Sequence, residues 1–245
     1  MRRLIGVFSL MMCFGYYCSS GIKGESGGFG RDTGVDIEDD TGSSLIPRVC
    51  PDYSGFLSVD STHSWRTRAE WAAEYGSSGT WSTSFSAWTE SDDVALITQE
   101  TSTSFVITGY EDYTTHQRVG YRCDADGLWL LASRLDYAFV YEGTAYSGWT
   151  EVVYTEPMLV LRPGLVVGSS WGSAVNTVTT TSTGSNLEGT VSYQYEVVGE
   201  EVVQTPAGEF NTLKLVNSEA NYAQWMDADA GVVLTDSGEL VSWSR

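Results

Sequence analysis

The chain has 245 residues, of which 18% are charged and 13% aromatic, and its 32 Asp and Glu residues against 13 Lys and Arg give a formal net charge of −19. A field of that sign repels phosphate backbones and anionic membrane faces, so the composition excludes nucleic-acid binding. About two hundred residues remain beyond the N-terminal segments, which is enough for one domain with a sizeable core.

Residues 1–20 have the three parts of a secretory leader. Arg2 and Arg3 precede a mostly apolar run over residues 4–17, and Cys18 and small polar residues follow it. The run is shorter than the ~20 residues that a helix needs to span a bilayer. We therefore expect an exported protein that works in the periplasm, at the outer membrane or at the cell surface.

The end of this leader has two interpretations. Cys18, followed by serines and a glycine, resembles the acylated cysteine of bacterial lipoproteins, and acylation there would anchor the chain to a membrane. Tyr17 stands where such leaders usually have a small residue, so ordinary cleavage after Ser20 or Gly21 is the alternative. Cys18 is the lipidation candidate.

Residues 21–47 are rich in glycine and acids and poor in apolar side chains, which predicts a flexible tether. A single domain is predicted over residues 48–245. Cys50 and Cys123 are its two cysteines. In an oxidising compartment such a pair is a disulfide candidate, and two unpaired buried cysteines are the alternative.

Threonine, valine and aromatic residues alternate with polar ones over residues 80–88, 190–197 and 211–216, which is typical of half-buried strands. Turn signals recur between such runs, at Asp126-Gly127, Glu142-Gly143, Pro163-Gly164, Thr183-Gly184, Pro206-Ala207-Gly208 and Ser237-Gly238. Many strands with short connections predict an all-β domain in which an antiparallel meander is favoured over parallel crossovers.

Residues 64–75 are ambiguous. Trp65, Thr67, Ala69 and Trp71 alternate as in a strand, and the glycines and serines of residues 76–79 would then join it to the next strand. The same segment also has a helical spacing with Gly76 as a C-cap. We expect the strand.

The most specific stretch lies over residues 195–216, where Val197, Gly199 and Glu201 precede a Pro206-Ala207-Gly208 turn, Phe210 and a strand at Lys214. It resembles a signature of exported bacterial β-proteins of unknown function, with V-x-G-x-E-x-V, then P-A-G-x-F, then K-V. These proteins also tend to have the L-x-V-G-x-x-W opening found at residues 165–171.

The resemblance implies a strongly curved antiparallel meander, a half-barrel or open barrel similar to that of lipoprotein-localisation factors. It implies no catalytic residues. In the turn itself, Pro206 presets the bend, Gly208 allows a tight exit and Phe210 is expected to fill the core beneath the hairpin.

No motif in the sequence indicates an enzyme, a cofactor or a metal centre. The two histidines, His63 and His116, have polar neighbours and are expected at the surface, and no serine has a Gly-x-Ser-x-Gly context. Two Asp-Ala-Asp clusters, at residues 124–126 and 227–229, are interpreted as turns, with calcium loops as the alternative.

The nine tryptophans are the most suggestive feature, because exposed rings on a sheet can stack sugars or line an apolar groove, whereas buried rings fill a core. The ligand-face candidates are Trp81, Trp88, Trp129 and Trp149. We expect an exported, membrane-tethered envelope protein with a non-enzymatic structural or protein-binding role. The alternative is a carrier or binding protein for a lipid, another apolar ligand or a carbohydrate on an aromatic-lined concave sheet face.

Overall fold

The computed structural model describes residues 61–91 and 94–244, and the side chains of these residues except 87–91. Within these ranges it has one short helix, α2 (Ala69–Tyr75), and twelve strands. The strands are β1 (Thr62–Thr67), β2 (Ser77–Ser91), β3 (Val94–Ile107), β4 (Tyr110–Asp124), β5 (Gly127–Tyr141), β6 (Thr144–Leu161), β7 (Ser170–Thr181), β8 (Asn186–Thr205), β9 (Gly208–Asn217), β10 (Tyr222–Asp227), β11 (Gly231–Thr235) and β12 (Gly238–Ser244).

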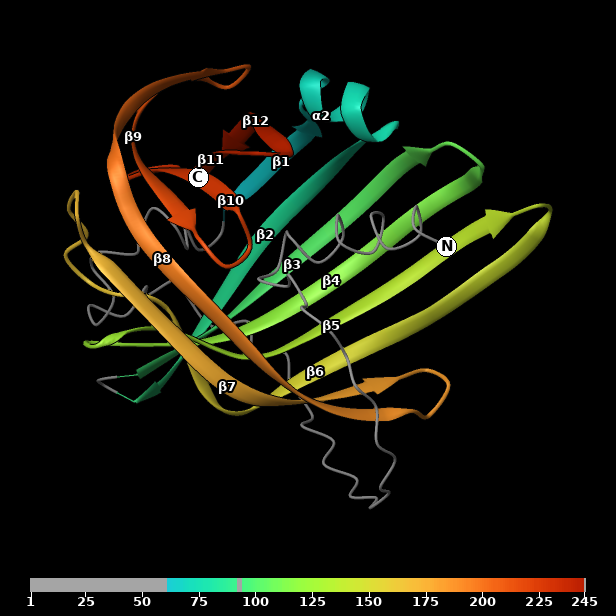
Figure 1. The fold of residues 1–245 in the computed structure, drawn as a ribbon, viewed down its shortest axis with the longest axis horizontal. Helices are drawn as coiled ribbons and strands as arrows, with labels where there is room; N and C mark the ends of the chain where they lie inside the picture. Colours follow the sequence, from blue (N-terminus) through green and yellow to red (C-terminus); the bar gives the residue numbers. More distant parts are fainter. Residues whose placement is uncertain (1–60, 92–93, 245) are drawn as a thin grey trace.

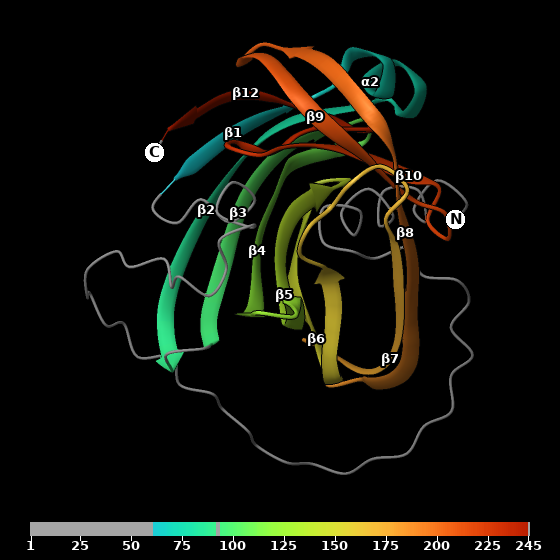
Figure 2. The same cartoon turned by 90° about the vertical axis from the view of Figure 1, so that its left-hand side faces the viewer.

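The strands form an antiparallel meander that closes into a barrel. Each strand pairs with its neighbours in sequence, and β1 pairs with β2 on one side and β12 on the other. The all-β meander is therefore confirmed, whereas the half-barrel or open barrel is wrong. Figures 1 and 2 show the strands curving around a shared interior, with β1 and β12 side by side. The closing pair joins the two ends of the domain, a contact that no local sequence pattern reveals.

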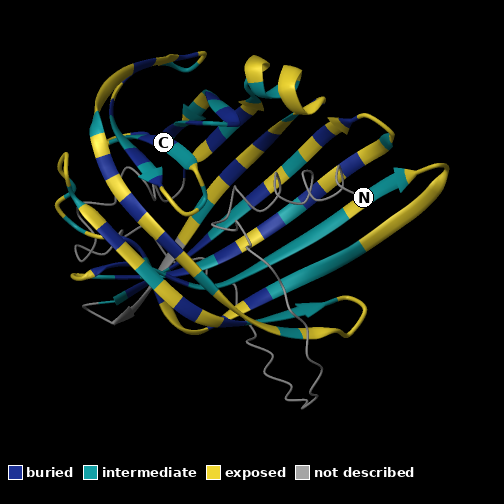
Figure 3. Cartoon of the chain, in the orientation of Figure 1, coloured by how far each residue is buried: buried dark blue, intermediate teal, exposed yellow. Residues whose placement is uncertain are grey.

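Alternation of side chains decides which face of the sheet is buried. On β4 every second residue from Tyr113 to Cys123 is buried, whereas His116, Arg118 and Arg122 lie on the opposite face. The same two-residue period appears as buried and exposed bands along most strands in Figure 3. We call the buried face inner and the opposite face outer.

The interior is filled by three packed groups of side chains. The largest gathers residues of β3 to β9, including the fully buried Leu128, Met158 and Leu215. A second joins Trp65 and Trp81, stacked with ring centroids 5.9 Å apart, to side chains of β8 to β12. The third is aromatic and lies at the end of the sheet formed by β3, β4 and β5.

The segment over residues 64–75 is divided between a strand and a helix. β1 ends at Thr67, and Ala69–Tyr75 is helical, so the expectation of one continuous strand is wrong. Gly76 ends the helix in the left-handed conformation, with φ of 64°, and its N–H donates to the carbonyl of Ala72. A residue with a Cβ is strained at this φ, which is why glycine ends the helix here.

The hairpin at Pro206-Ala207-Gly208 packs against the second group of buried side chains. Phe210 is buried there, as expected, and the backbone N–H of Ala207 donates to the carbonyl of Leu240 at 3.3 Å. The leader, the tether and Cys50 lie outside the described residues. No helix in residues 61–91 and 94–244 is long and apolar enough to cross a membrane.

The β5–β6 hairpin projects past the packed interior. β6 pairs with β7 only over residues 150–154, although β6 itself begins at Thr144. In Figure 1 this hairpin extends away from the tip of the β7–β8 hairpin, and Figure 3 shows its tip as exposed. Side chains near this tip are therefore held by the sheet without being covered by the opposite wall.

Candidate functional site

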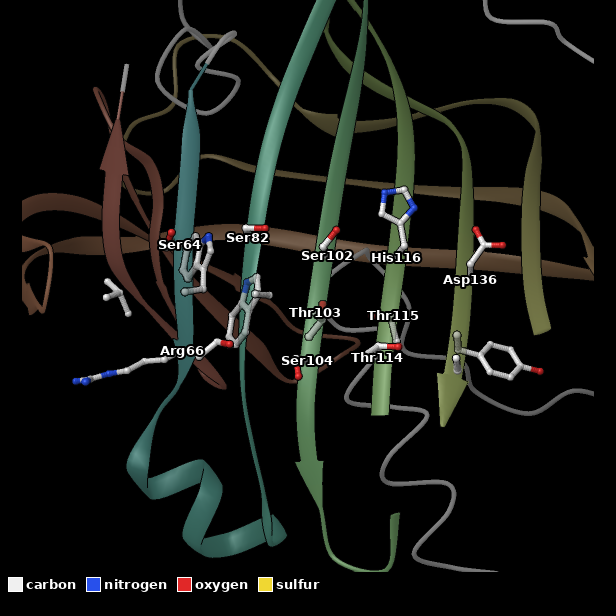
Figure 4. A pocket seen from close by; sticks show the side chains of 16 residues that line it. Ser64, Arg66, Ser82, Ser102, Thr103, Ser104, Thr114, Thr115, His116 and Asp136 are labelled. Carbon is white, nitrogen blue, oxygen red and sulfur yellow. The ribbon is translucent and has the colours of Figure 1, made fainter. Parts of the chain in front are cut away.

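A shallow trough of about 830 Å³ crosses the outer face of β1 to β5 (Figure 4). Serine and threonine make up half of its lining residues, many of them in two neighbouring rows of the sheet, and Trp65, Trp81 and Tyr137 between these rows also line it. The rows contain Ser64, Ser82, Ser102, His116 and Asp136, and Arg66, Thr80, Ser104, Thr114 and Ala138. These residues alternate along their strands with the side chains that fill the interior.

Ser102, His116 and Asp136 are direct neighbours on β3, β4 and β5 and point to the same side in Figure 4. In the described structure no hydrogen bond joins His116 to either neighbour, and Asp136 instead accepts one from Arg134 at 3.1 Å. The backbone N–H groups around them belong to a continuous sheet ladder, so they are not free to stabilise an oxyanion. The row therefore has the residue types of a serine hydrolase without an oriented base or an oxyanion hole.

Three tryptophans share one arrangement, in which a basic side chain lies over the ring and pairs with a carboxylate. The sets are Trp129 with Arg122 and Asp124, Trp149 with Arg134 and Asp136, and Trp225 with Lys214 and Glu201. The cation lies 5.7, 4.7 and 4.8 Å from the ring centroid, respectively. Cation–π attraction and ion pairing act together in each set, so each of these basic side chains is held by a ring and a carboxylate of the same domain.

Two of the carboxylates are held ionised by these contacts. Burial raises the pKa of Asp124, but hydrogen bonds from Trp129, Arg122 and the backbone of Asp126 outweigh it and hold the pKa below its ordinary value. The indole of Trp225 donates to Glu201 at 2.7 Å and lowers the pKa of that carboxyl. Neither group is poised as a general acid near neutral pH.

The two Asp-Ala-Asp clusters form turns. Oδ1 of Asp124 accepts the backbone N–H of Asp126 and Gly127, at 3.0 and 3.1 Å. Oδ1 of Asp227 accepts the N–H groups of Asp229 and Ala230, both at 2.9 Å. These bonds are the ones that favour aspartate in turns. Within the described ranges, no three His, Cys, Asp or Glu side chains gather as a metal ion would require.

The four ligand-face candidates do not form one surface. Trp81 points inward and is 5% exposed in the packed core. Trp129 and Trp149 pair with Arg122 and Asp136 on the outer face. The side chain of Trp88 lies outside the described residues.

The expectation of a surface position is wrong for His63. It is 3% exposed, its Nε2 lies 3.0 Å from the carbonyl oxygen of Ala230, and its ring stacks 6.4 Å from that of Trp243. Burial lowers the pKa of His63, and the backbone hydrogen bond to Ala230 opposes this only in part. His63 is therefore a neutral core residue. The polar neighbours seen in the sequence lie on the opposite face of β1.

An aromatic cluster on the inner face of the projecting sheet was missed by the sequence analysis. We call it the aromatic ladder: Tyr110, Tyr113, Tyr137, Phe139, Tyr141 and Tyr146. The rings of Tyr113 and Phe139 stack 5.3 Å apart, and Phe139 and Tyr146 stack at 5.2 Å. Tyr146 is 47% exposed. The alternation of Tyr137, Phe139 and Tyr141 along β5 was the available signal.

Two tyrosines of the ladder, Tyr113 and Tyr141, have a raised pKa. Desolvation, with smaller contributions from Tyr110 and Tyr137, raises the pKa of Tyr113. A hydrogen bond with Glu142 raises the pKa of Tyr141. Tyr113 and Tyr141 are thus neutral phenols, and Tyr141 lies beside the carboxylate of Glu142.

Comparison of the chain with family models, with curated proteins and with solved structures finds no match.

Proposed function

We propose that this chain is an exported, membrane-tethered envelope protein that acts by binding another envelope protein and not by catalysis. The observation that carries the proposal is the exposed end of the aromatic ladder, where Tyr141 and Tyr146 are 39% and 47% exposed next to the buried ring of Tyr113. Contiguous exposed apolar surface on a soluble domain is typical of an interaction site. The packed core supports binding at the surface over carriage of an apolar ligand inside the barrel.

The chemistry of the outer face also supports a binding role. Asp136 is paired with Arg134, and His116 has no hydrogen bond to the serine or the carboxylate beside it. A hydrolase needs a nucleophile, a base and an orienting acid in contact, together with donors for the oxyanion. The Ser102–His116–Asp136 row lacks these contacts.

The anchor and the disulfide belong to the same proposal. Acylation at Cys18 would hold the domain at a membrane on the tether of residues 21–47. The proposed Cys50–Cys123 bridge is supported by the complete burial of Cys123. It would join the end of the tether to the buried end of β4.

Site-specific photocrosslinking in the original host tests the binding role. A benzoylphenylalanine at position 146 should give one discrete adduct with a protein, whereas the same group at Glu209, exposed on the β8–β9 hairpin, should not. Identical patterns from both positions would contradict the proposal. So would esterase or peptidase turnover by the purified chain that disappears in His116→Ala.

Mass spectrometry of the same preparation tests the anchor. A diacylglycerol-modified N-terminus at Cys18, absent in Cys18→Ser, is expected. An unmodified N-terminus after Ser20 or Gly21 would show ordinary secretion instead.

A further inference from the structure

Among the strands that the structure describes, the first part of β6 pairs with none on the side away from β5. The register of β6 with β7 begins at Thr150, and the backbone N–H of Ser182 donates to the carbonyl of Trp149 at 2.9 Å. Residues 144–148 pair with β5 alone in the described structure. Alternate backbone N–H and C=O groups along these residues therefore face solvent, which is the arrangement to which an extended peptide can add as a further strand.

The exposed edge is continuous with the aromatic ladder. Tyr146 is its last ring, and one face of that ring is covered by Phe139. Because the rings stack across successive strands and β6 has no neighbour here, the other face of Tyr146 is directed toward the edge. A side chain of an added strand opposite Tyr146 would lie against that face.

The charge at the tip of the β5–β6 hairpin is negative. Glu142 lies in the turn before β6, and the start of β4 adds Glu111 and Asp112. Arg134, the basic residue of β5, lies over Trp149 and pairs with Asp136 on the outer face. The facing β7–β8 hairpin, residues 176–192, adds Glu188 and no basic residue. Carboxylates beside an open aromatic face attract a cation both by charge and through the ring quadrupole.

We propose that the edge of β6 at residues 144–148 binds an extended, Lys- or Arg-bearing segment of a partner protein by strand addition, with a cationic side chain on Tyr146. This rests on the proposed binding function and names the chemistry of the partner. Five residues of strand span about 17 Å, so a short segment fills the edge before the β7–β8 turn stops it. A second copy of this chain fits less well, since pairing two such edges brings their carboxylates together.

Fluorescence anisotropy with short peptides and the full mature chain tests this. The probe is a labelled nine-residue peptide of alternating lysine and valine. Two comparison peptides replace lysine with glutamate, or carry N-methyl groups on alternate amides. We expect binding by the lysine peptide only, because the glutamate peptide is repelled and the methylated one cannot complete the ladder of hydrogen bonds.

Substitutions test whether the peptide binds at this edge. Tyr146→Leu keeps an apolar side chain without the ring and should weaken binding about two- to fivefold, as expected for a solvent-exposed cation–π contact. Glu142→Gln should weaken it similarly, and this loss should vanish at 0.5 M salt, a concentration chosen to screen surface charges. The matched controls are Tyr75→Leu on α2 and Glu209→Gln on the β8–β9 hairpin, both exposed and both expected to leave binding unchanged.

Several outcomes would overturn the inference. Equal binding of the lysine and N-methylated peptides would exclude strand addition. If the control variants Tyr75→Leu and Glu209→Gln lose as much affinity for the lysine peptide as Tyr146→Leu and Glu142→Gln do, the peptide does not bind at this edge. Binding of a neutral oligosaccharide in place of the peptide, or dimerisation that Tyr146→Leu abolishes, would assign the edge to another occupant. If crosslinking from position 146 still captures a protein, only the basic-strand inference fails and the binding function stands.

Discussion

Gly238, the first residue of β12, tests whether Trp81 belongs to the core or to a ligand face. A Cβ built on Gly238 would lie 2.5 Å from Cζ2 of Trp81, at least 1 Å closer than an ordinary carbon contact of ~3.5–4.0 Å. The indole is 5% exposed and stacked on Trp65, so moving it away from a new methyl group would disturb this stack. Gly238→Ala should therefore overpack the core at a cost of about 1–3 kcal/mol.

Gly120→Ala on β4 is the matched control. A Cβ at Gly120 would have its nearest neighbour, the carbonyl oxygen of Ala132, at 4.0 Å. Both substitutions restrict the unfolded chain to the same degree, so the difference between the two variants isolates the strain. In urea unfolding Gly238→Ala should be the less stable by about 1–3 kcal/mol at an unchanged m-value, or by roughly 2–12 °C in Tm.

A double mutant completes the test. In a Trp81→Phe background the smaller ring leaves space for the new methyl group, so Gly238→Ala should cost at least ~0.5 kcal/mol less than in the native chain. Equal stability of Gly238→Ala and Gly120→Ala, or additive effects in the double mutant, would refute a closely packed Trp81.

Three further perturbations follow from the buried polar groups and the proposed bridge. Because burial lowers the pKa of His63 below 6.5, the unfolded chain takes up the proton first, so the free energy of unfolding should fall as the pH drops from about 7 toward 5. His63→Gln should flatten this slope, and an unchanged slope in urea titrations would contradict the assignment. Asp124→Ala leaves the indole N–H of Trp129 and two turn N–H groups without their acceptor and should cost about 1–3 kcal/mol, more than Asp227→Ala, which removes two turn bonds alone. If a disulfide joins Cys50 and Cys123, reduction of the mature chain should lower its free energy of unfolding by about 4 kcal/mol. An unchanged free energy of unfolding under reductant would show that the two cysteines are not bridged.

The strands predicted over residues 80–88, 190–197 and 211–216 lie in β2, β8 and β9, because a two-residue period is a local property that pleating imposes on every half-buried strand. The buried position of Phe210 was likewise readable from its place after a tight turn. The helix at Ala69–Tyr75 was not. Over so short a segment alternating and helical spacings coincide, and the cap at Gly76 was the better guide.

The sequence by itself determined the acidic charge, the leader pattern, the all-β class and the antiparallel meander, since each depends on composition or on neighbours along the chain. Only the tertiary structure decided that β1 meets β12, that Trp81 and His63 point inward, and that Tyr146 ends a stack of rings at an unpaired edge. Barrel closure and register set these features, and both depend on contacts between residues far apart in the chain. Alternation assigns side chains to two faces, but only closure fixes which face is inside.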